Sequence, residues 1–417
     1  MRRGTGTLPS ARPSGAAILS ESPSAEIKTV VFRLSVLMFL QWAVPGSLVP
    51  LYSYHLEHLG FGPLTVAVCC AAQAAASIVS SLLTGQLADR WLPAQRAMTL
   101  FAAAAGIDLW VLADLHHPAA VLAATLLFWL LTGPMILLGI TVAFTHLPEP
   151  DRQFGPVRLW GTVGWMAVGW LISGWLNLGG AQPPITDAFR LGGVVAFVLA
   201  AYTFTLPHTP PRCDVSATHR PAPVQAIVQL WRPSFVVYCA CLLGACVTFP
   251  FSTQSTPLLL THLGVPPERL SLVLTLAQTT EVAALAALPV LVRRFGLRGT
   301  MLFGLTAWLA ANAILSIGRP FELVVSSLVL NGFYVTCFMI AGQVYVNGQT
   351  RADLRASAQA LISFLSGIGM LGGNLLAGGL RRWSGGELPP TFAVAAGLTA
   401  VLLLVFLFGF RAEVRRE

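Results

Sequence analysis

Long hydrophobic runs separated by short polar turns dominate the sequence. A helix that crosses the hydrocarbon core of a bilayer needs about 20 apolar residues. Twelve stretches meet this requirement, at about 30–52, 64–86, 96–114, 118–146, 157–178, 187–206, 233–260, 267–292, 299–317, 321–346, 354–379 and 389–410. The pattern predicts an all-α membrane protein with twelve transmembrane helices.

The overall composition favours the same environment. Hydrophobic residues make up 55% of the 417 positions and charged residues only 10%, whereas about a quarter of the residues of a soluble domain are charged. Residues 1–28 are polar and contain Pro9, Pro13 and Pro23, unlike the apolar core of a secretory signal peptide. We expect an uncleaved, disordered cytoplasmic tail.

The positions of the basic residues predict the orientation. The formal net charge is +8, but the basic side chains lie between the hydrophobic runs and not in one patch, which argues against a nucleic-acid surface. With the amino terminus inside, 20 of the 25 Lys and Arg residues fall on the inner side and 5 on the outer side. Cytoplasmic loops are enriched in Lys and Arg, so both termini are predicted to be cytoplasmic, in the inner membrane of the cell.

A proline-rich segment divides the predicted helices into two sets of six. Residues 207–232 are polar and contain five prolines, and we interpret them as a cytoplasmic linker. The predicted units are therefore a six-helix half at 29–206, a second half at 233–410 and a short cytoplasmic tail at 411–417. Each half has a basic turn between its second and third helices, at 85–96 and 291–300, as in the internal repeats of transporters.

No pattern in the sequence indicates an enzyme or a bound cofactor. The seven cysteines form no CxxC pair and no cluster with metal-ligand spacing, so we expect neither disulfides nor a metal site. A phosphate-binding loop and a nucleophile–base pair are also missing from the sequence. We therefore assign no catalytic residue and no cofactor.

The first basic turn carries a short motif. GQLADRW, at 85–91, resembles the signature that major facilitator proteins carry between their second and third helices. The resemblance implies the major facilitator fold. Gly85 would permit close helix approach, and Asp89 and Arg90 would form charge-assisted contacts that hold the two halves together. The alternative is an ordinary acidic–basic pair in a loop.

Two acidic residues lie well inside predicted spans. Ionisable side chains near the bilayer centre are costly, by roughly 2.5–3.5 kcal/mol, and are functional candidates. Glu281 is near the middle of the eighth span, and Gln278 shares its helical face. Desolvation disfavours the carboxylate anion, which suits a group that binds and releases a proton, although a neutral packing residue is the alternative. For Asp108, in the third span, we prefer a structural role to one in an outward vestibule.

The fifth span begins with a polar stripe. Arg158, Thr162 and Trp165 are spaced at i, i+4 and i+7 and share one helical face. The guanidinium can donate paired hydrogen bonds and the indole can stack on an apolar ring. The stripe is therefore a candidate site for a hydroxylated or heterocyclic solute, and the alternative for Arg158 is a positive anchor at the start of a helix.

The eleventh span contains closely spaced glycines. Gly369 and Gly373 lie about one helical turn apart in SGIGMLGGNLLAGG, and Asn374 follows them. This spacing usually marks helix–helix contact. We predict a packing or hinge role, with a hydrogen bond from Asn374 to a neighbouring helix.

Several blocks resemble one family of transporters. FGPVRLWGTVGW is similar to the fifth-helix motif of the bacterial nucleoside:proton symporters and, more distantly, to that of the lactose permease group. The likeness continues in FTLPHTPP at 204–211, in QTTEVAALAALPVLVRRFGLRGTM at 278–301 and in RASAQALISFLSGIGMLGG at 355–373. The resemblance implies that Arg158, Thr162, Trp165 and Gln278 contact substrate and that Glu281 is the coupling acid.

The sequence departs from that family at three positions. In the seventh helix, where the nucleoside symporters place amide side chains, an ungapped alignment places Thr248 and Phe251. In the tenth helix, where they place a carboxylate, it places Thr336. These replacements leave the identity of the solute open.

The leading hypothesis is a proton symporter that imports nucleosides or a related hydroxylated small molecule by alternating access. A sugar or other solute facilitator of the same fold is an alternative, and a receptor or scaffold that does not transport is a further one. The expected partners are the solute, protons and the lipid bilayer, and we expect a monomer without nucleic acid.

Overall fold

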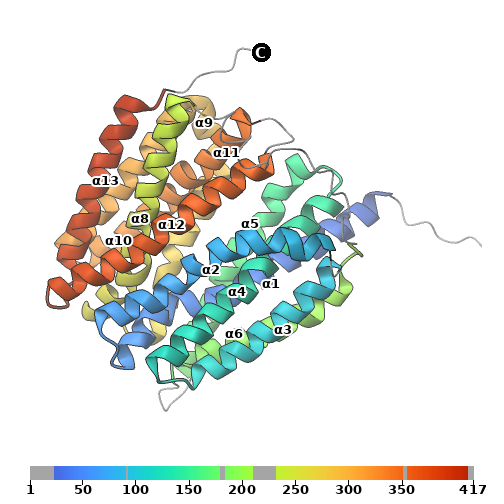
Figure 1. Cartoon of the computed structure of the whole chain (residues 1–417), viewed down its shortest axis with the longest axis horizontal. Coiled ribbons are helices and arrows are strands. Elements are labelled where there is room, and N and C mark those ends of the chain that lie inside the picture. The colour runs from blue at the N-terminus through green and yellow to red at the C-terminus, as the bar shows by residue number, and fades with distance from the viewer. Residues whose placement is uncertain (1–22, 91–92, 179–183, 210–231, 351–354, 412–417) are drawn as a thin grey trace, which may run out of the picture.

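The computed structural model describes residues 23–90, 93–178, 184–209, 232–350 and 355–411, and these are helical apart from short turns, with no strand among them. Figure 1 shows the arrangement. The helices are α1 (Pro23–His58), α2 (Pro63–Arg90), α3 (Ala94–Ala113), α4 (Pro118–His146), α5 (Pro150–Leu178), α6 (Asp187–Tyr202), η1 (Thr203–Thr205), α8 (Pro233–His262), α9 (Pro267–Ile317), α10 (Phe321–Tyr334), η2 (Val335–Ile340), α11 (Ala341–Gln349), α12 (Arg355–Trp383) and α13 (Pro389–Gly409).

Prolines and glycines set several helix boundaries. Proline occupies the first turn of α4, α8, α9 and α13, where its fixed φ suits a helix and its missing N–H is not needed. Gly296 lies inside α9 with φ 68° and ψ 168°. Its left-handed conformation breaks the 51-residue helix between the two predicted spans 267–292 and 299–317.

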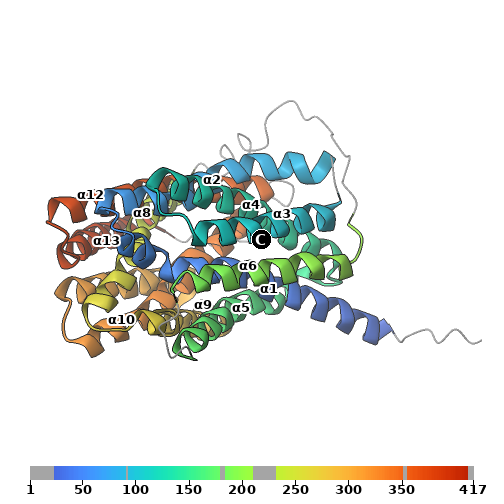
Figure 2. The ribbon, with the colours of Figure 1, turned by 90° about the horizontal axis from the view of Figure 1, so that it is seen from below.

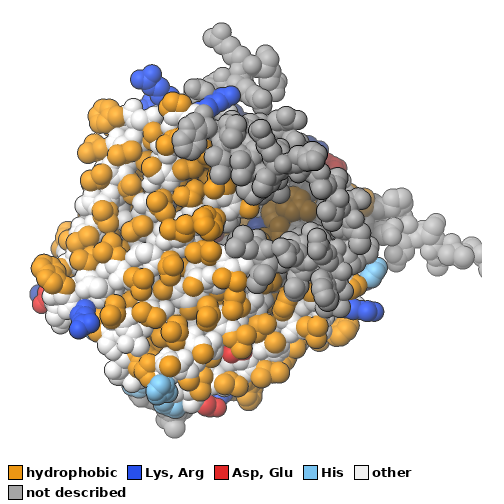
Figure 3. Space-filling model, in the orientation of Figure 1, with side chains coloured by type: hydrophobic (Ala, Val, Ile, Leu, Met, Phe, Trp, Pro, Cys, Tyr) orange, Lys and Arg blue, Asp and Glu red, His pale blue; other side chains and the backbone are white. Residues whose placement is uncertain are grey.

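Ten helical segments within the described residues are long and apolar enough to cross a membrane. The segment Pro267–Ile317 counts once among them, and α5 is not one of the ten. The space-filling view in Figure 3 shows hydrophobic side chains spread over the face between the ends of the molecule. The protein is therefore all-helical and has many membrane-length helices, as the sequence predicted.

The helices form two groups that meet along one edge. Figure 1 shows α1 to α6, in blue to green, beside α8 to α13, in yellow to red, with α2 next to α12, and Figure 2 shows the same groups from below. The indole N–H of Trp170 in α5 donates to Thr275 in α9 at 3.0 Å, and Ser173 accepts from the backbone N–H of Leu272 at 3.2 Å. Glu57 at the end of α1 forms an ion pair with Arg381 at the end of α12.

The glycine spacing in α12 packs this helix against α8, as predicted. A Cβ atom on Gly369 would lie 2.7 Å from the carbonyl oxygen of Leu243, and one on Gly373 would overlap the backbone of Val247. The expectation for Asn374 was wrong, because its amide donates at 2.8 Å to the Met370 carbonyl of its own helix. An i−4 carbonyl is the nearest acceptor for a short polar side chain on a helix.

Candidate functional site

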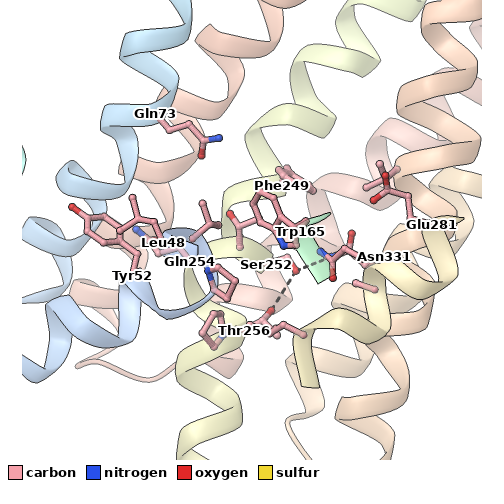
Figure 4. A pocket seen from close by; sticks show the side chains of 18 of the residues that line it. Leu48, Tyr52, Gln73, Trp165, Phe249, Ser252, Gln254, Thr256, Glu281 and Asn331 are labelled. Atoms are coloured by element: carbon pink, nitrogen blue, oxygen red, sulfur yellow. Dashed lines mark hydrogen bonds between the residues drawn. The ribbon is translucent and has the colours of Figure 1, made fainter. Parts of the chain in front are cut away.

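A cavity of about 380 Å³ lies between the two groups of helices. Ligand pockets for small molecules usually measure about 300–1,000 Å³. Figure 4 shows Tyr52, Leu48 and Gln73 on one side of it, and Asn331 and Glu281 on the other. The surface of its lining is mostly apolar and aromatic, and polar side chains from several helices are set into it, as expected for a site that binds a small organic molecule.

The predicted stripe on α5 lines this cavity. Arg158, Thr162 and Trp165 all contribute to the wall, because their spacing places them on one side of the helix. The Arg158 guanidinium carbon lies 4.1 Å from the ring centroid of Trp42 in α1. Arg158 is thus in a cavity wall, with a geometry that differs from that of an anchor extended toward lipid headgroups.

The predicted pair on α9 lines the same cavity. Glu281 is half-buried. From α5, the Arg158 guanidinium interacts with its carboxyl group electrostatically, and the Thr162 hydroxyl is its hydrogen-bonding neighbour. Arg158 forms no salt bridge with Glu281 or with another carboxylate in the described ranges. The buried Oε1 of Gln278 has no hydrogen-bond partner among the described residues. The structure brings together all five predicted binding and coupling residues.

Helix α10 presses directly against the segment that carries Glu281. A Cβ atom on Gly332 would lie 2.5 Å from both the Ala277 carbonyl oxygen and the Glu281 backbone nitrogen, so only glycine permits this approach. Beyond it, α10 widens into the π-helical turn η2, where the Thr336 hydroxyl donates at 3.4 Å to the Glu281 carbonyl. Single π-helical turns often occur at functional sites.

Sequence reasoning missed the polar side chains that α8 and α10 contribute. Gln254 lines the cavity, is 5% exposed, and its amide nitrogen has no hydrogen-bond partner among the described residues. The amide of Asn331 donates at 3.4 Å to Ser252, as Figure 4 shows. A neutral amide in an apolar helix stands out less in a sequence than a charge, but both amides interrupt otherwise apolar or hydroxyl-bearing stretches.

The three aligned positions lie outside the cavity wall. Phe251 is fully buried, and the Thr248 hydroxyl accepts a hydrogen bond from the indole of Trp308 at 2.8 Å. Thr336 instead contacts the backbone of Glu281. The amide on α8 that faces the cavity is Gln254, six residues after Thr248 in the sequence.

Two other predicted features are not among the residues that line the described cavity. Asp108 is 7% exposed within α3 and does not line the cavity, and its Oδ2 has no hydrogen-bond partner in the described ranges. Gly85, Asp89 and Arg90 belong to a stretch whose side chains lie outside the described residues. Their predicted gating contact remains a prediction.

Comparison with known proteins identifies the family. Residues 28–415 match the profile of the nucleoside H+ symporters. The chain belongs to the nucleoside H+ symporter family. It is therefore a proton-coupled nucleoside transporter of the cell inner membrane, and not an enzyme, as the sequence predicted.

Individual relatives and structures agree with this assignment. Xanthosine permease of Escherichia coli is 28% identical over 92% of this chain and 96% of the permease. Nucleoside permease NupG of the same organism is 24% identical over 91% and 95%. A crystal structure of nucleoside transporter NupG superposes with a TM-score of 0.77 at 22% identity, covering 92% of this chain and 100% of that one, which shows the major facilitator fold.

Proposed function

We propose that this transporter imports a nucleoside with a proton through the cavity between its two halves, with Glu281 as the proton-binding group. The observation that carries the proposal is that Glu281 shares one cavity with Arg158, Thr162, Trp165 and Gln278. A carboxyl group that takes up a proton there loses its charge, and a neutral loaded carrier reorients across the bilayer more easily. Xanthosine permease and NupG carry substrates of this class by name.

Reconstitution into liposomes tests this function. Labelled nucleosides and sugars are offered with and without an inward proton gradient. We expect nucleosides, xanthosine among them, to accumulate only with the gradient, and sugars to remain outside. Gradient-independent equilibration would indicate a facilitator, and accumulation of sugars would support the alternative solute.

Twelve transmembrane helices in two halves are part of the proposal. Two spans are counted within α9 because Gly296 interrupts it, and α5 is long enough, at 29 residues, to cross the bilayer. The halves then comprise 29–206 and 233–410, joined by a cytoplasmic linker at 207–232 and flanked by cytoplasmic segments at 1–28 and 411–417. The expectation that all of 1–28 is disordered was wrong for residues 23–28, which belong to α1. We further propose that the protein functions as a monomer, because this chain supplies both groups of helices that enclose the cavity.

Several described contacts between the halves lie toward one side of the proposed bundle. Trp170, Ser173, Glu57 and Arg381 all lie at the end of the molecule that the distribution of basic residues assigns to the outside. These contacts support a conformation in which the two halves meet on the outer side of the cavity.

The proposed topology predicts the location of both chain ends. Epitope tags fused before residue 1 and after residue 417 should be reached by antibody or protease only from the cytoplasmic side. The physical reason is the 20-to-5 distribution of Lys and Arg, because basic loops are retained in the cytoplasm. Labelling of either tag in intact spheroplasts would contradict an even number of spans with this orientation.

Gln254 is proposed as a substrate contact because its buried amide nitrogen has no partner among the described residues. Gln254→Leu keeps most of the side-chain volume and removes the hydrogen bonds. One lost hydrogen bond is worth about 0.5–1.5 kcal/mol, so nucleoside affinity, measured by ligand-dependent thermal stabilisation, should fall about two- to tenfold. Thr248→Val is the control on the same helix, and it should lower stability without changing affinity. Equal affinities for Gln254→Leu and the wild type would remove Gln254 from the site.

A further inference from the structure

Arg158, the only arginine that lines the described cavity, stacks on the indole ring of Trp42. Arg158 lies over the Trp42 ring at 4.1 Å, within the roughly 6 Å range of a cation–π contact. Trp42 also lines the cavity, and its buried indole N–H has no hydrogen-bond partner among the described residues. Arg158 therefore has an aromatic partner where a carboxylate partner would be expected.

Close packing of α1 on α5 creates this contact. A Cβ atom on Gly46 would lie 3.1 Å from the Trp165 Cα, and one on Gly164 would overlap the Phe39 carbonyl. At Gly161 a Cβ atom would lie 2.6 Å from Trp42 Cδ1 and 2.7 Å from Arg158 Nη1. Small residues let helix backbones approach closely, and here they place the indole of α1 directly against the arginine of α5.

The opposite charge in the cavity is near but not paired. Among the described titratable groups on the elements packed around Glu281, Arg158 is the charged group that interacts electrostatically with its carboxyl group. The Thr162 hydroxyl is the polar group beside it. The two charged groups nevertheless form no salt bridge. A direct bidentate pair would hold the carboxylate in its charged form, which would oppose proton uptake.

We propose that Trp42 is a positioning residue that holds the Arg158 guanidinium on its indole face and away from Glu281, leaving the carboxyl group free to take up a proton. This inference rests on the proposed roles of Arg158 and Glu281. When the indole face is lost, the guanidinium is released toward Glu281. The carboxylate is then stabilised, and a higher proton concentration is needed to neutralise it.

The experiment measures nucleoside uptake by proteoliposomes as a function of external pH for Trp42→Leu, Trp42→Phe and Gly161→Ala. An arginine beside a carboxylate lowers the protonation midpoint by roughly one to three pH units, so Trp42→Leu should move the pH midpoint of uptake down by about one unit or more. Trp42→Phe keeps an aromatic face and should shift it less. Gly161→Ala inserts a methyl group between the two side chains and should shift it in the same direction while Trp42 is intact.

Trp160→Leu is the matched control, because Trp160 is on α5 two residues from Arg158 but is 48% exposed on the outside of the bundle. Its pH midpoint should be that of the wild type. The inference is overturned if Trp42→Leu and Gly161→Ala leave the midpoint unchanged, or if Trp42→Leu lowers affinity equally at every pH, as loss of a direct substrate contact would. Glu281→Gln separates this inference from the proposed function. A flat pH profile in Glu281→Gln would support Glu281 as the proton-binding group even if the role of Trp42 is wrong. A pH profile like that of the wild type in Glu281→Gln would contradict the proposed function.

Discussion

Glu281→Gln should abolish gradient-driven accumulation of nucleoside while substrate exchange continues. Glutamine reproduces the shape and neutrality of the protonated acid but cannot release a proton. A gradient of one pH unit stores about 1.4 kcal/mol per proton, so one-to-one symport supports about tenfold accumulation in the wild type. The variant should reach only equal concentrations on both sides. Counterflow between equally loaded sides should survive, because Arg158, Thr162 and Gln278 remain in the cavity.

The pH dependence of uptake provides a second measurement on the same variant. Removal of the titrating group should flatten the pH profile. Asp108→Asn is the matched control, because Asp108 is also a buried acid within a helix but does not line the cavity. It should accumulate nucleoside with a normal profile. If Glu281→Gln still concentrates its substrate with an unchanged profile, Glu281 is a packing residue and Asp108 becomes the next candidate for the coupling acid.

The sequence predicted the part of the site that depends on charge and helical spacing. Glu281 is conspicuous because an acid within an apolar run is costly, and Gln278 follows from its place one turn earlier. Arg158, Thr162 and Trp165 follow from their shared helical face. Their convergence across the two halves was implied by family resemblance, because periodicity defines a face of one helix but not the helix that it meets.

The remaining contacts depend on tertiary packing that no local pattern encodes. Trp42 is one aromatic residue among many in apolar helices, and only the glycine-mediated approach of α1 to α5 places it against Arg158. In α8, Pro250 and Pro257 lie within the helix around Gln254. Proline removes a backbone hydrogen bond and kinks a helix, so counting positions from an ungapped alignment does not identify the residue that faces the cavity. The two spans predicted at 267–292 and 299–317 lie on either side of the non-helical Gly296 within α9.

Arg158→Lys should weaken nucleoside binding strongly without disturbing membrane insertion. Lysine keeps the positive charge but has no planar fork of donors, so it cannot make paired hydrogen bonds to a substrate. A hydrogen bond from a charged group is worth about 1.5–3 kcal/mol, which corresponds to a loss of affinity of roughly tenfold to a hundredfold. The measurement is binding of a labelled nucleoside to purified protein in detergent, with the amount of folded protein determined by size-exclusion chromatography.

Arg152→Lys is the matched control for this prediction. Arg152 is on the same helix, is exposed, and forms an ion pair with Glu149 at 3.3 Å. Exposed pairs of this kind contribute little to stability, about 0–1 kcal/mol, so affinity and yield should both equal those of the wild type. Normal affinity in Arg158→Lys, at a normal yield of folded protein, would show that a positive charge at this position suffices and that Arg158 acts as an anchor and not as a substrate contact.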